Sequence, residues 1–391
     1  MTDGMHMTKE QARRFLLRRH GLLGSYQFAG EQGVMEFVRR MGCLQFDPVD
    51  VCGKNAELVL LSRVKGFTRP MLSRLLYEKR TLVDYFDKNL AIFPVEDWPY
   101  FERSRREHRQ WERSHQEIEA VKEQVKGEIA RRGPLCSADL DMPEKVHWYW
   151  SDTKLSRAAL EHLYFTGELA VHHKKGTIKY YDLIEKCLPT EILAAPDPNP
   201  DEGDHRKWRV LRRIRSVGFL WNRPSDAWLN IPGINGAERE RIFSQLLKEG
   251  EITAFQVEGI REPFYMSSRE WKPDGEWLLN KAWKKRCEFI APLDNLMWDR
   301  KLIQAVFGFD YKWEIYTPKD KRKYGHYVLP ILYGDTFAGR IEAVADRKNG
   351  ILDVQNIWYE PCFRQSIGFA RALDGAVRRL AEFNCLQLPA E

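Results

Sequence analysis

The stretch Leu44-Gln45-Phe46-Asp47-Pro48 combines residue types that could carry out chemistry. A proline biases the residue before it toward an extended backbone, so Asp47 is predicted to be extended. Side chains alternate faces in an extended segment, so Gln45 and Asp47 should point one way and Phe46 the other way, into the local core. An amide and a carboxylate would then lie side by side. A structural alternative is a turn after a helix, with Asp47 capping the segment that follows.

A carboxylate beside an amide suits hydrolysis of an N-glycosidic bond, which develops oxocarbenium character on the sugar. Asp47 would stabilise that positive charge and hold or deprotonate the attacking water, and Gln45 would orient the same water. A departing base that is already cationic, as an N7-alkylpurine is, needs little acid assistance. One carboxylate then suffices, so we expect neither a metal nor a cofactor.

The composition indicates a multidomain protein with packed cores and a mild positive charge. The chain has 391 residues, of which 43% are hydrophobic, and a net charge of +6 from 62 basic and 56 acidic residues. That charge suggests a polyanionic partner only if it is concentrated. Thirteen tryptophans are many for this length, and a few of them could stack on bases.

Several classes of protein are disfavoured by what the sequence lacks. It has no secretory signal, no apolar run long enough for a membrane span, and seven scattered cysteines with no CxxC pair. No Walker loop, dinucleotide fingerprint, HExxH or GxSxG motif is present. We therefore expect a cytoplasmic protein with reduced thiols.

Helices followed by a short hairpin recur along the chain, which is the layout of a winged helix. The first copy has predicted helices at residues 8–20, 31–41, 56–63 and 69–79 and strands at 81–86 and 90–93. Thr8 and Gln11 have the spacing of a capping box at the start of the first helix. A second copy ends a helix at 163–167 and enters strands 169–173 and 177–182. A third ends a helix near 250 and enters strands 252–257 and 263–266. Three weak copies are more informative than one.

Two connectors and a different C-terminal pattern complete the predicted organisation. Residues 98–132 read as one long charged helix whose arginines either face phosphates or pair with glutamates at helical spacing, and residues 194–203 read as a Pro-rich linker. Beyond 277, strands are predicted at 287–290, 311–316, 327–333, 337–345 and 351–359, with a last helix at 364–383. Gly334-Asp335 and Asn349-Gly350 are predicted hairpin turns. The predicted domains are 1–100, 101–193, 204–272 and 273–391.

Cationic and titratable clusters give further candidates. Lys321, Arg322 and Lys323 lie in a loop between predicted strands, where they could contact phosphates or form an ordinary charged loop. His172 and His173 are adjacent on a strand, so they should face opposite sides and not form one ligand set. Asp294 and Asp299, with Trp298 and Arg300, could line a cleft, although Asp299 also fits an N-cap.

Taken together, the motifs resemble those of the YcaQ/AlkZ-type winged-helix DNA glycosylases. The resemblance rests on short runs that follow in order along nearly the whole chain: residues 44–47, 53–60, 84–89, 94–99, 179–183, 291–300, 316–318 and 321–330. The family's catalytic motif is Gln–apolar–Gln or Gln–apolar–Asp. Gln45-Phe46-Asp47 therefore resembles the YcaQ-like branch, which has the broader specificity.

The resemblance implies an α+β fold of tandem winged-helix domains with a C-terminal antiparallel β-rich domain, C-shaped around a basic channel. It implies excision of N7-alkylated purines and unhooking of interstrand crosslinks by a monomer that binds alkylated double-stranded DNA, with catalytic Gln45 and Asp47. The residues expected to contact DNA are Lys54, Asn55, Arg300, Lys321, Arg322 and Lys323. Asp50-Val51-Cys52 and Lys54-Asn55-Ala56-Glu57 depart from the YcaQ pattern, which leaves the substrate range open.

Two alternatives differ in mechanism or in class. Lys54 is near enough in sequence to act as the nucleophile of a strand-cleaving enzyme, whereas the pair Gln45 and Asp47 predicts a monofunctional glycosylase. The rival class is a non-catalytic winged-helix regulator, which would select a DNA sequence. A glycosylase would select lesions with little preference for sequence.

Overall fold

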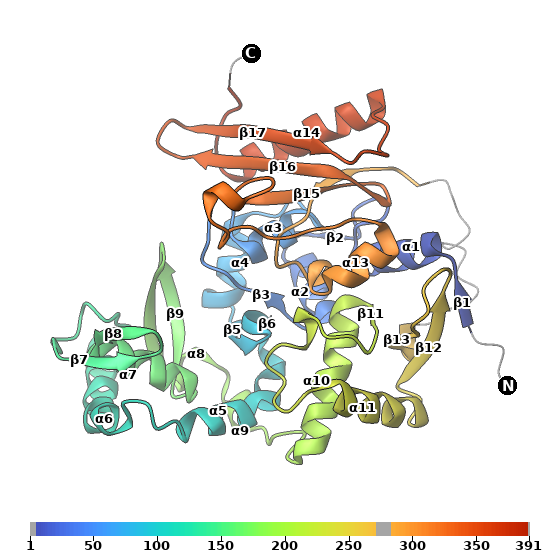
Figure 1. Ribbon diagram of the computed structural model, residues 1–391. Helices are drawn as coiled ribbons and strands as arrows, with labels where there is room; N and C mark the ends of the chain where they lie inside the picture. Colours follow the sequence, from blue (N-terminus) through green and yellow to red (C-terminus); the bar gives the residue numbers. More distant parts are fainter. Residues whose placement is uncertain (1–4, 271–282, 390–391) are drawn as a thin grey trace. The chain divides into compact units, whose positions relative to one another are not determined.

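The computed structural model describes residues 5–270 and 283–389 (Figure 1). The chain divides into two compact units. The first contains Met1–Leu72, Phe86–Ile92 and Arg206–Glu391, and the second contains Ser73–Tyr85 and Phe93–His205. The first unit is therefore built from three separate stretches of sequence.

Local signals set the ends of the first helices. Helix α1 (Lys9–Arg19) begins at the predicted capping box, in which the Thr8 side chain accepts from the Gln11 N–H and the Gln11 side chain accepts from the Thr8 N–H. Helix α2 (Gly30–Met41) ends at Gly42, whose φ of 79° suits glycine. Most or all of six further helices belong to the first unit: α3 (Asn55–Leu61), α4 (Arg69–Ser73), α10 (Glu202–Val217), α11 (Gly236–Lys248), α13 (Arg300–Phe307) and α14 (Ile367–Phe383).

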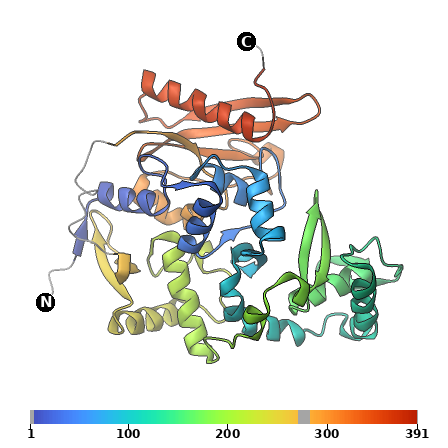
Figure 2. The ribbon, with the colours of Figure 1, turned by 180° about the vertical axis from the view of Figure 1, so that it is seen from behind.

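A four-stranded antiparallel sheet forms the C-terminal part of this unit. Its strands, in spatial order, are β14 (Cys287–Phe289), β15 (Val328–Tyr333), β16 (Thr336–Asp346) and β17 (Ile351–Tyr359). The predicted turns at Gly334-Asp335 and Asn349-Gly350 join the last three strands, and α14 lies along one face of the sheet (Figures 1 and 2). The strand predicted at 311–316 is wrong. That segment is irregular, and the buried Tyr311 hydroxyl donates to the Val328 carbonyl over 2.8 Å.

Three smaller sheets include strands with no alternating pattern in the sequence. The first has the order β1 (Met5–Met7), β12 (Ile252–Val257), β13 (Phe264–Ser267) and β11 (Phe219–Leu220), with β1 parallel to β12. The second pairs β2 (Phe28–Ala29) with β4 (Val64–Lys65). The third has the order β3 (Leu44–Gln45), β6 (Asn89–Pro94) and β5 (Leu82–Asp87).

The second unit corrects the prediction of one long helix at 98–132. A 3₁₀ segment, Val95–Phe101, contains Pro99 and leads into α5 (Glu102–Arg109), and α6 (His115–Arg132) starts only after Ser114, whose φ is 47°. A left-handed residue cannot continue a right-handed helix, so the two helices are separate. Of the arginines predicted to face phosphates or pair, Arg105 and Arg109 both bind Glu102.

The rest of the second unit consists of one longer helix, short helices and hairpins. They are the π-helical turn Arg74–Glu78, β7 (Lys145–Trp148), β8 (Ser151–Lys154), α7 (Leu155–Phe165), β9 (Leu169–Lys175), β10 (Ile178–Leu183), α8 (Ile184–Cys187) and α9 (Thr190–Ala194). His172 and His173 do not face opposite sides as predicted, because their Nδ1 atoms lie 2.9 Å apart. The register of β9 and β10 shifts at this point, and such a bulge breaks the alternation of side chains.

The fold class is α+β with antiparallel sheets, as predicted. Helices run directly into antiparallel hairpins at the three expected places: α4 and its π-helical turn into β5 and β6, α7 into β9 and β10, and α11 into β12 and β13. Four short 3₁₀ turns complete the description: Asp226–Trp228, Ser268–Glu270, Asn295–Met297 and Lys319–Lys321. Within the described residues, no helix has the length and apolarity needed to cross a membrane.

Candidate active site

The backbone of Gln45 is held on both sides by hydrogen bonds within the first unit. Gln45 pairs with Ala91 of β6, and the next N–H, from Phe46, donates to the Leu90 carbonyl over 2.8 Å. The Gln45 carbonyl accepts from the Asn55 amide at 2.8 Å. These bonds fix the position from which the Gln45 side chain projects.

Lys88 fixes the orientation of the Gln45 side chain. Its Nζ lies 2.7 Å from Gln45 Oε1, and both side chains are buried. An ammonium group has donors only, so the oxygen of the amide must face Lys88. The Nε2 hydrogens of Gln45 therefore point away from Lys88.

The surroundings of Lys88 lower the pKa of its ammonium group. Burial lowers the pKa of Lys88 to about 8, and the positive charges of Arg213 and Arg300 add to this, while Asp226 and Cys43 oppose it. The ammonium also lies 5.1 Å from the centre of the Trp298 ring, a cation–π contact that favours the charged form. Lys88 is thus a buried cation poised to titrate near neutral pH.

Asp87, the neighbour of Lys88, is bound by three arginines of α10. Its carboxylate accepts from Arg212 at 2.7 Å and from Arg213 at 2.5 Å, and it pairs with Arg209 at 3.2 Å. Burial alone would raise the pKa of Asp87, but these three charges outweigh it and hold that pKa well below its ordinary value. The cluster anchors the tip of the β5–β6 hairpin, and with it Lys88, to α10.

Asp47 is half-buried, and its carboxylate caps the turn that follows, as the structural alternative predicted. One carboxylate oxygen accepts from the Val49 N–H at 2.9 Å, so Asp47 does cap the turn that follows. Burial raises the pKa of Asp47, and the Val49 hydrogen bond opposes that rise. The predicted core position of Phe46 is wrong: Phe46 is half-buried, and Gln45 is the buried residue.

The loop after Asp47 is tied to the C-terminal sheet and helix. The Val51 carbonyl accepts from Ala345 at 2.9 Å, Asp50 pairs with Arg347 at 2.7 Å, and the Cys52 carbonyl accepts from Asn384 at 3.0 Å. Burial raises the pKa of Tyr327, and the negative charge of Asp47 contributes to that rise. A phenol therefore lies within electrostatic reach of the candidate carboxylate.

Two predicted DNA contacts lie near this site. Lys54 is half-buried at the N-cap of α3, where its own N–H donates to Glu57 at 3.2 Å. Arg300 is the first residue of α13, and its guanidinium lies 5.7 Å from the Tyr311 ring centre and acts electrostatically on Lys88.

Asn55, also predicted to contact DNA, is buried with both ends of its amide engaged. Its Oδ1 accepts from the Leu293 N–H at 2.9 Å, and its Nδ2 donates to the Gln45 carbonyl. This side chain therefore joins the Gln45 strand to the segment that precedes α13.

In the basic loop at 321–323, backbone N–H groups bind a carboxylate of the protein, whereas two of the charged side chains are exposed to solvent. The Glu314 carboxylate accepts the backbone N–H groups of Lys323 and Tyr324, each at 2.9 Å. Arg322 is half-buried and donates to the Thr317 carbonyl at 2.8 Å, whereas the side chains of Lys321 and Lys323 are exposed. The two lysines are thus the charges of this loop that solvent reaches.

Asp294 and Asp299 are buried caps and do not line a cleft. Asp294 accepts from the Leu296 N–H at 2.9 Å and pairs with the buried Arg63 at 2.7 Å. Asp299 caps α13 through the Leu302 N–H at 2.9 Å, as its alternative prediction stated, and accepts from Trp221 at 2.8 Å.

Residue-by-residue reasoning missed the role of Lys88 and the arginine cluster on Asp87. Both residues lie between the predicted strands 81–86 and 90–93 and in the run 84–89 of the family resemblance, and neither has a predicted role of its own. A lysine at a hairpin tip is ordinarily a solvated charge. Its burial depends on α10, which lies more than a hundred residues further along the chain.

Comparisons with known proteins bear on the family and the fold of the chain. The protein family described as "DNA glycosylase AlkZ-like" matches residues 38–383, a range that includes the candidate residues. Among solved structures, the Streptomyces sahachiroi DNA glycosylase AlkZ is similar with a TM-score of 0.63 and 15% sequence identity, covering 98% of this chain and 100% of that one. At that identity the structural match indicates a shared fold. The family match extends over most of the sequence. The chain belongs to the AlkZ-like DNA glycosylase family.

Proposed function

We propose that this protein hydrolyses the N-glycosidic bond of N7-alkylated purines in duplex DNA and unhooks interstrand crosslinks formed at the same atom. The observation that carries the proposal is a half-buried carboxylate, Asp47, two residues after a buried amide, Gln45, whose orientation Lys88 fixes. An N7-alkylpurine leaves as a neutral base, so the reaction needs charge stabilisation and a water more than it needs an acid.

The proposed mechanism divides these tasks between two side chains. Asp47 stabilises the oxocarbenium ion and accepts a proton from the attacking water, which bonds to C1′ as the bond to the base breaks. Gln45 donates from Nε2 to the oxygen of that water, because Lys88 occupies Oε1. A raised pKa brings Asp47 nearer to the range in which a carboxylate is an effective base.

The proposed enzyme is monofunctional. A strand-cleaving mechanism would need a lysine amine as nucleophile, and the site offers Lys54 at the N-cap of α3 or Lys88 beside Gln45. The Lys88 ammonium already donates to Gln45 Oε1 and contacts the Trp298 ring. Borohydride added during turnover should therefore trap no covalent protein–DNA adduct. A trapped adduct would show that a lysine amine, and not water, is the nucleophile.

The DNA-binding part of the proposal uses winged-helix modules and a basic surface. Lys54, Arg300, Lys321, Arg322 and Lys323 are the proposed phosphate contacts, and Asn55 acts by positioning Gln45. Exposed lysines bind phosphates by releasing counterions, so each contact contributes about one unit to the slope of log affinity against log salt.

Replacing the two exposed lysines of the basic loop tests that surface. We expect Lys321→Ala with Lys323→Ala to weaken duplex binding and to reduce the salt slope by about 2. Fluorescence anisotropy at several salt concentrations measures both quantities. Lys248→Ala, at an exposed position on α11, is the matched control and should leave the slope unchanged. An unchanged slope in the double variant would remove this loop from the interface.

Lys88 should impose an alkaline limit on base excision. Lys88→Met is expected to lower the single-turnover rate by about 10- to 100-fold, because Gln45 loses the group that orients it. In the wild type the rate should fall as the pH rises through about 8, where Lys88 loses its proton. The lower excision rate that remains in Lys88→Met should not fall over this pH range. The same loss of rate at alkaline pH in both proteins would mean that a group other than Lys88 causes it.

Base release from a defined lesion tests the function itself. The substrate is a duplex carrying one N7-methylguanine, or one nitrogen-mustard crosslink, at a known position. We expect release of the free base and an intact abasic strand, with an undamaged duplex as the control. Binding without release on both substrates would contradict the proposed lesion class and favour a regulator.

A further inference from the structure

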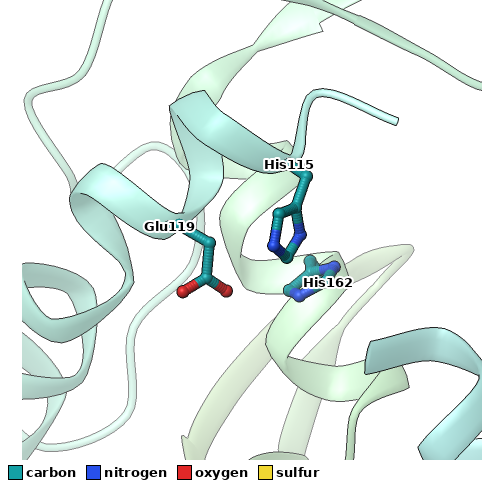
Figure 3. Close-up of side chains that lie close together, drawn as sticks. All are labelled: His115, Glu119 and His162. Atoms are coloured by element: carbon teal, nitrogen blue, oxygen red, sulfur yellow. The ribbon is translucent and has the colours of Figure 1, made fainter. Parts of the chain in front are cut away.

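A group of potential metal ligands lies in the second unit, outside the candidate active site. His115 and Glu119 are one turn apart on α6, and His162 is on α7, which packs against α6. One nitrogen of each histidine and one oxygen of Glu119 lie within 4.8 Å of one another. Figure 3 shows the three side chains pointing toward one another from the two helices.

The two imidazoles differ in burial. His162 is buried, and His115 is half-buried. Among the described residues, His115 Nδ1 is buried with no hydrogen-bond partner. An unpaired buried nitrogen costs free energy unless another group satisfies it.

We propose that His115, Glu119 and His162 bind a divalent transition-metal ion of the zinc type, with the remaining coordination open to water. Two imidazoles and one carboxylate are a donor set that Zn²⁺ accepts in proteins. Bond lengths of about 2.0–2.1 Å place ligand atoms about 3.3 Å apart in a tetrahedral site. Side-chain rotations that move each ligand atom by less than about 1 Å close the observed spread to that value.

Lys122 competes with the ion for Glu119. Its Nζ lies 2.6 Å from Glu119 Oε2, and both side chains are about one-third exposed. An ion that takes this oxygen must displace the ammonium, whereas an ion bound to the other oxygen is repelled by the nearby charge. Lys122 therefore lowers the affinity, and its removal should raise it.

Such an ion would join α6 to α7. It bridges two helices of one unit by three bonds, and it binds the folded state in preference to the unfolded chain. Binding should therefore raise the melting temperature of the second unit. The inference is independent of the proposed glycosylase chemistry, which takes place in the first unit.

Metal titration of the full chain tests the proposal. The protein should carry no polyhistidine tag and be stripped with a chelator before titration with Zn²⁺ by calorimetry and with Co²⁺ by visible absorption. We expect one ion per chain and a cobalt spectrum without thiolate charge transfer, which excludes the cysteines as ligands. Zn²⁺ should also raise the melting temperature.

Four variants separate this site from adventitious binding. His115→Asn and Glu119→Gln, both at half-buried positions, should each weaken Zn²⁺ binding by more than about 100-fold, since loss of even an outer-shell partner costs 10- to 100-fold. Lys122→Met should tighten binding several-fold. His147→Asn, at an exposed histidine of the same unit, is the control and should bind as the wild type does. Equal affinity in wild type and His115→Asn, or no saturable binding by the wild type, would overturn the proposal.

Discussion

Asp47→Asn should abolish base excision while leaving DNA binding intact or stronger. The variant keeps the shape of the side chain and its acceptor for the Val49 N–H, but it removes the negative charge that we propose to stabilise the oxocarbenium ion and to receive the proton. Groups of this kind contribute about 10²- to 10⁴-fold to a rate. Single-turnover release of N7-methylguanine, with binding measured on the same duplex, separates the two effects.

Asp50→Asn is the matched control for this experiment. Asp50 lies in the same loop and is also half-buried, but it pairs with Arg347 and has no proposed role in the reaction. Its rate should stay within a few-fold of the wild type. A fully active Asp47→Asn protein would end the proposed mechanism, because no other charge has been assigned to that step.

Asp87→Ala should be the most destabilising single substitution near the site. It leaves Arg209, Arg212 and Arg213 buried without their common counter-charge, and breaking a buried ion pair from one side costs about 3–5 kcal/mol. Urea unfolding, with hydrogen exchange of α10 as a local probe, measures the loss. Excision should fall as well, because Lys88 is adjacent to the lost anchor.

The low pKa of Asp87 determines how the stability difference between wild type and Asp87→Ala should change with pH. The folded state depresses the pKa of Asp87, so its stabilising effect is present above the unfolded value of about 3.9 and is lost as the pH falls below it. The difference in stability between wild type and Asp87→Ala should therefore shrink in acid. Asp374→Ala, which breaks an exposed pair with Arg378, should cost less than about 1 kcal/mol. Equal losses in the two variants would contradict the role given to the arginine cluster.

The features that could be predicted from the sequence are those determined by neighbouring residues. Thr8 and Asp299 cap helices as expected, and Asn349-Gly350 turns a hairpin, because each of these signals acts within a few residues. The exception is the segment 98–132, where the charged pattern continued past a break at Ser114 that only the backbone shows.

The features that could not be predicted depend on partners distant in sequence. Gln45 and Asp47 stood out by type and spacing, but the burial of Gln45 and its bond to Lys88 require the β3–β6 pairing. The same holds for β1, a three-residue strand that has no pattern of its own and exists because β12 pairs with it. The resemblance to a family supplied the function that these local signals left open.

The arginine cluster on Asp87 also has a consequence for synthesis of the chain. Arg213 follows Asp87 by 126 residues, and nearly all of the second unit is translated between them. At about 5–20 residues per second, roughly 6 to 25 s pass between the emergence of the two partners. During that interval the nascent chain already contains Gln45, Asp47 and Lys88 but lacks the three arginines that bind Asp87 in the hairpin carrying Lys88. The surroundings of the proposed catalytic residues are thus completed only after α10 has left the ribosome, by which time nearly all of the second unit has been translated.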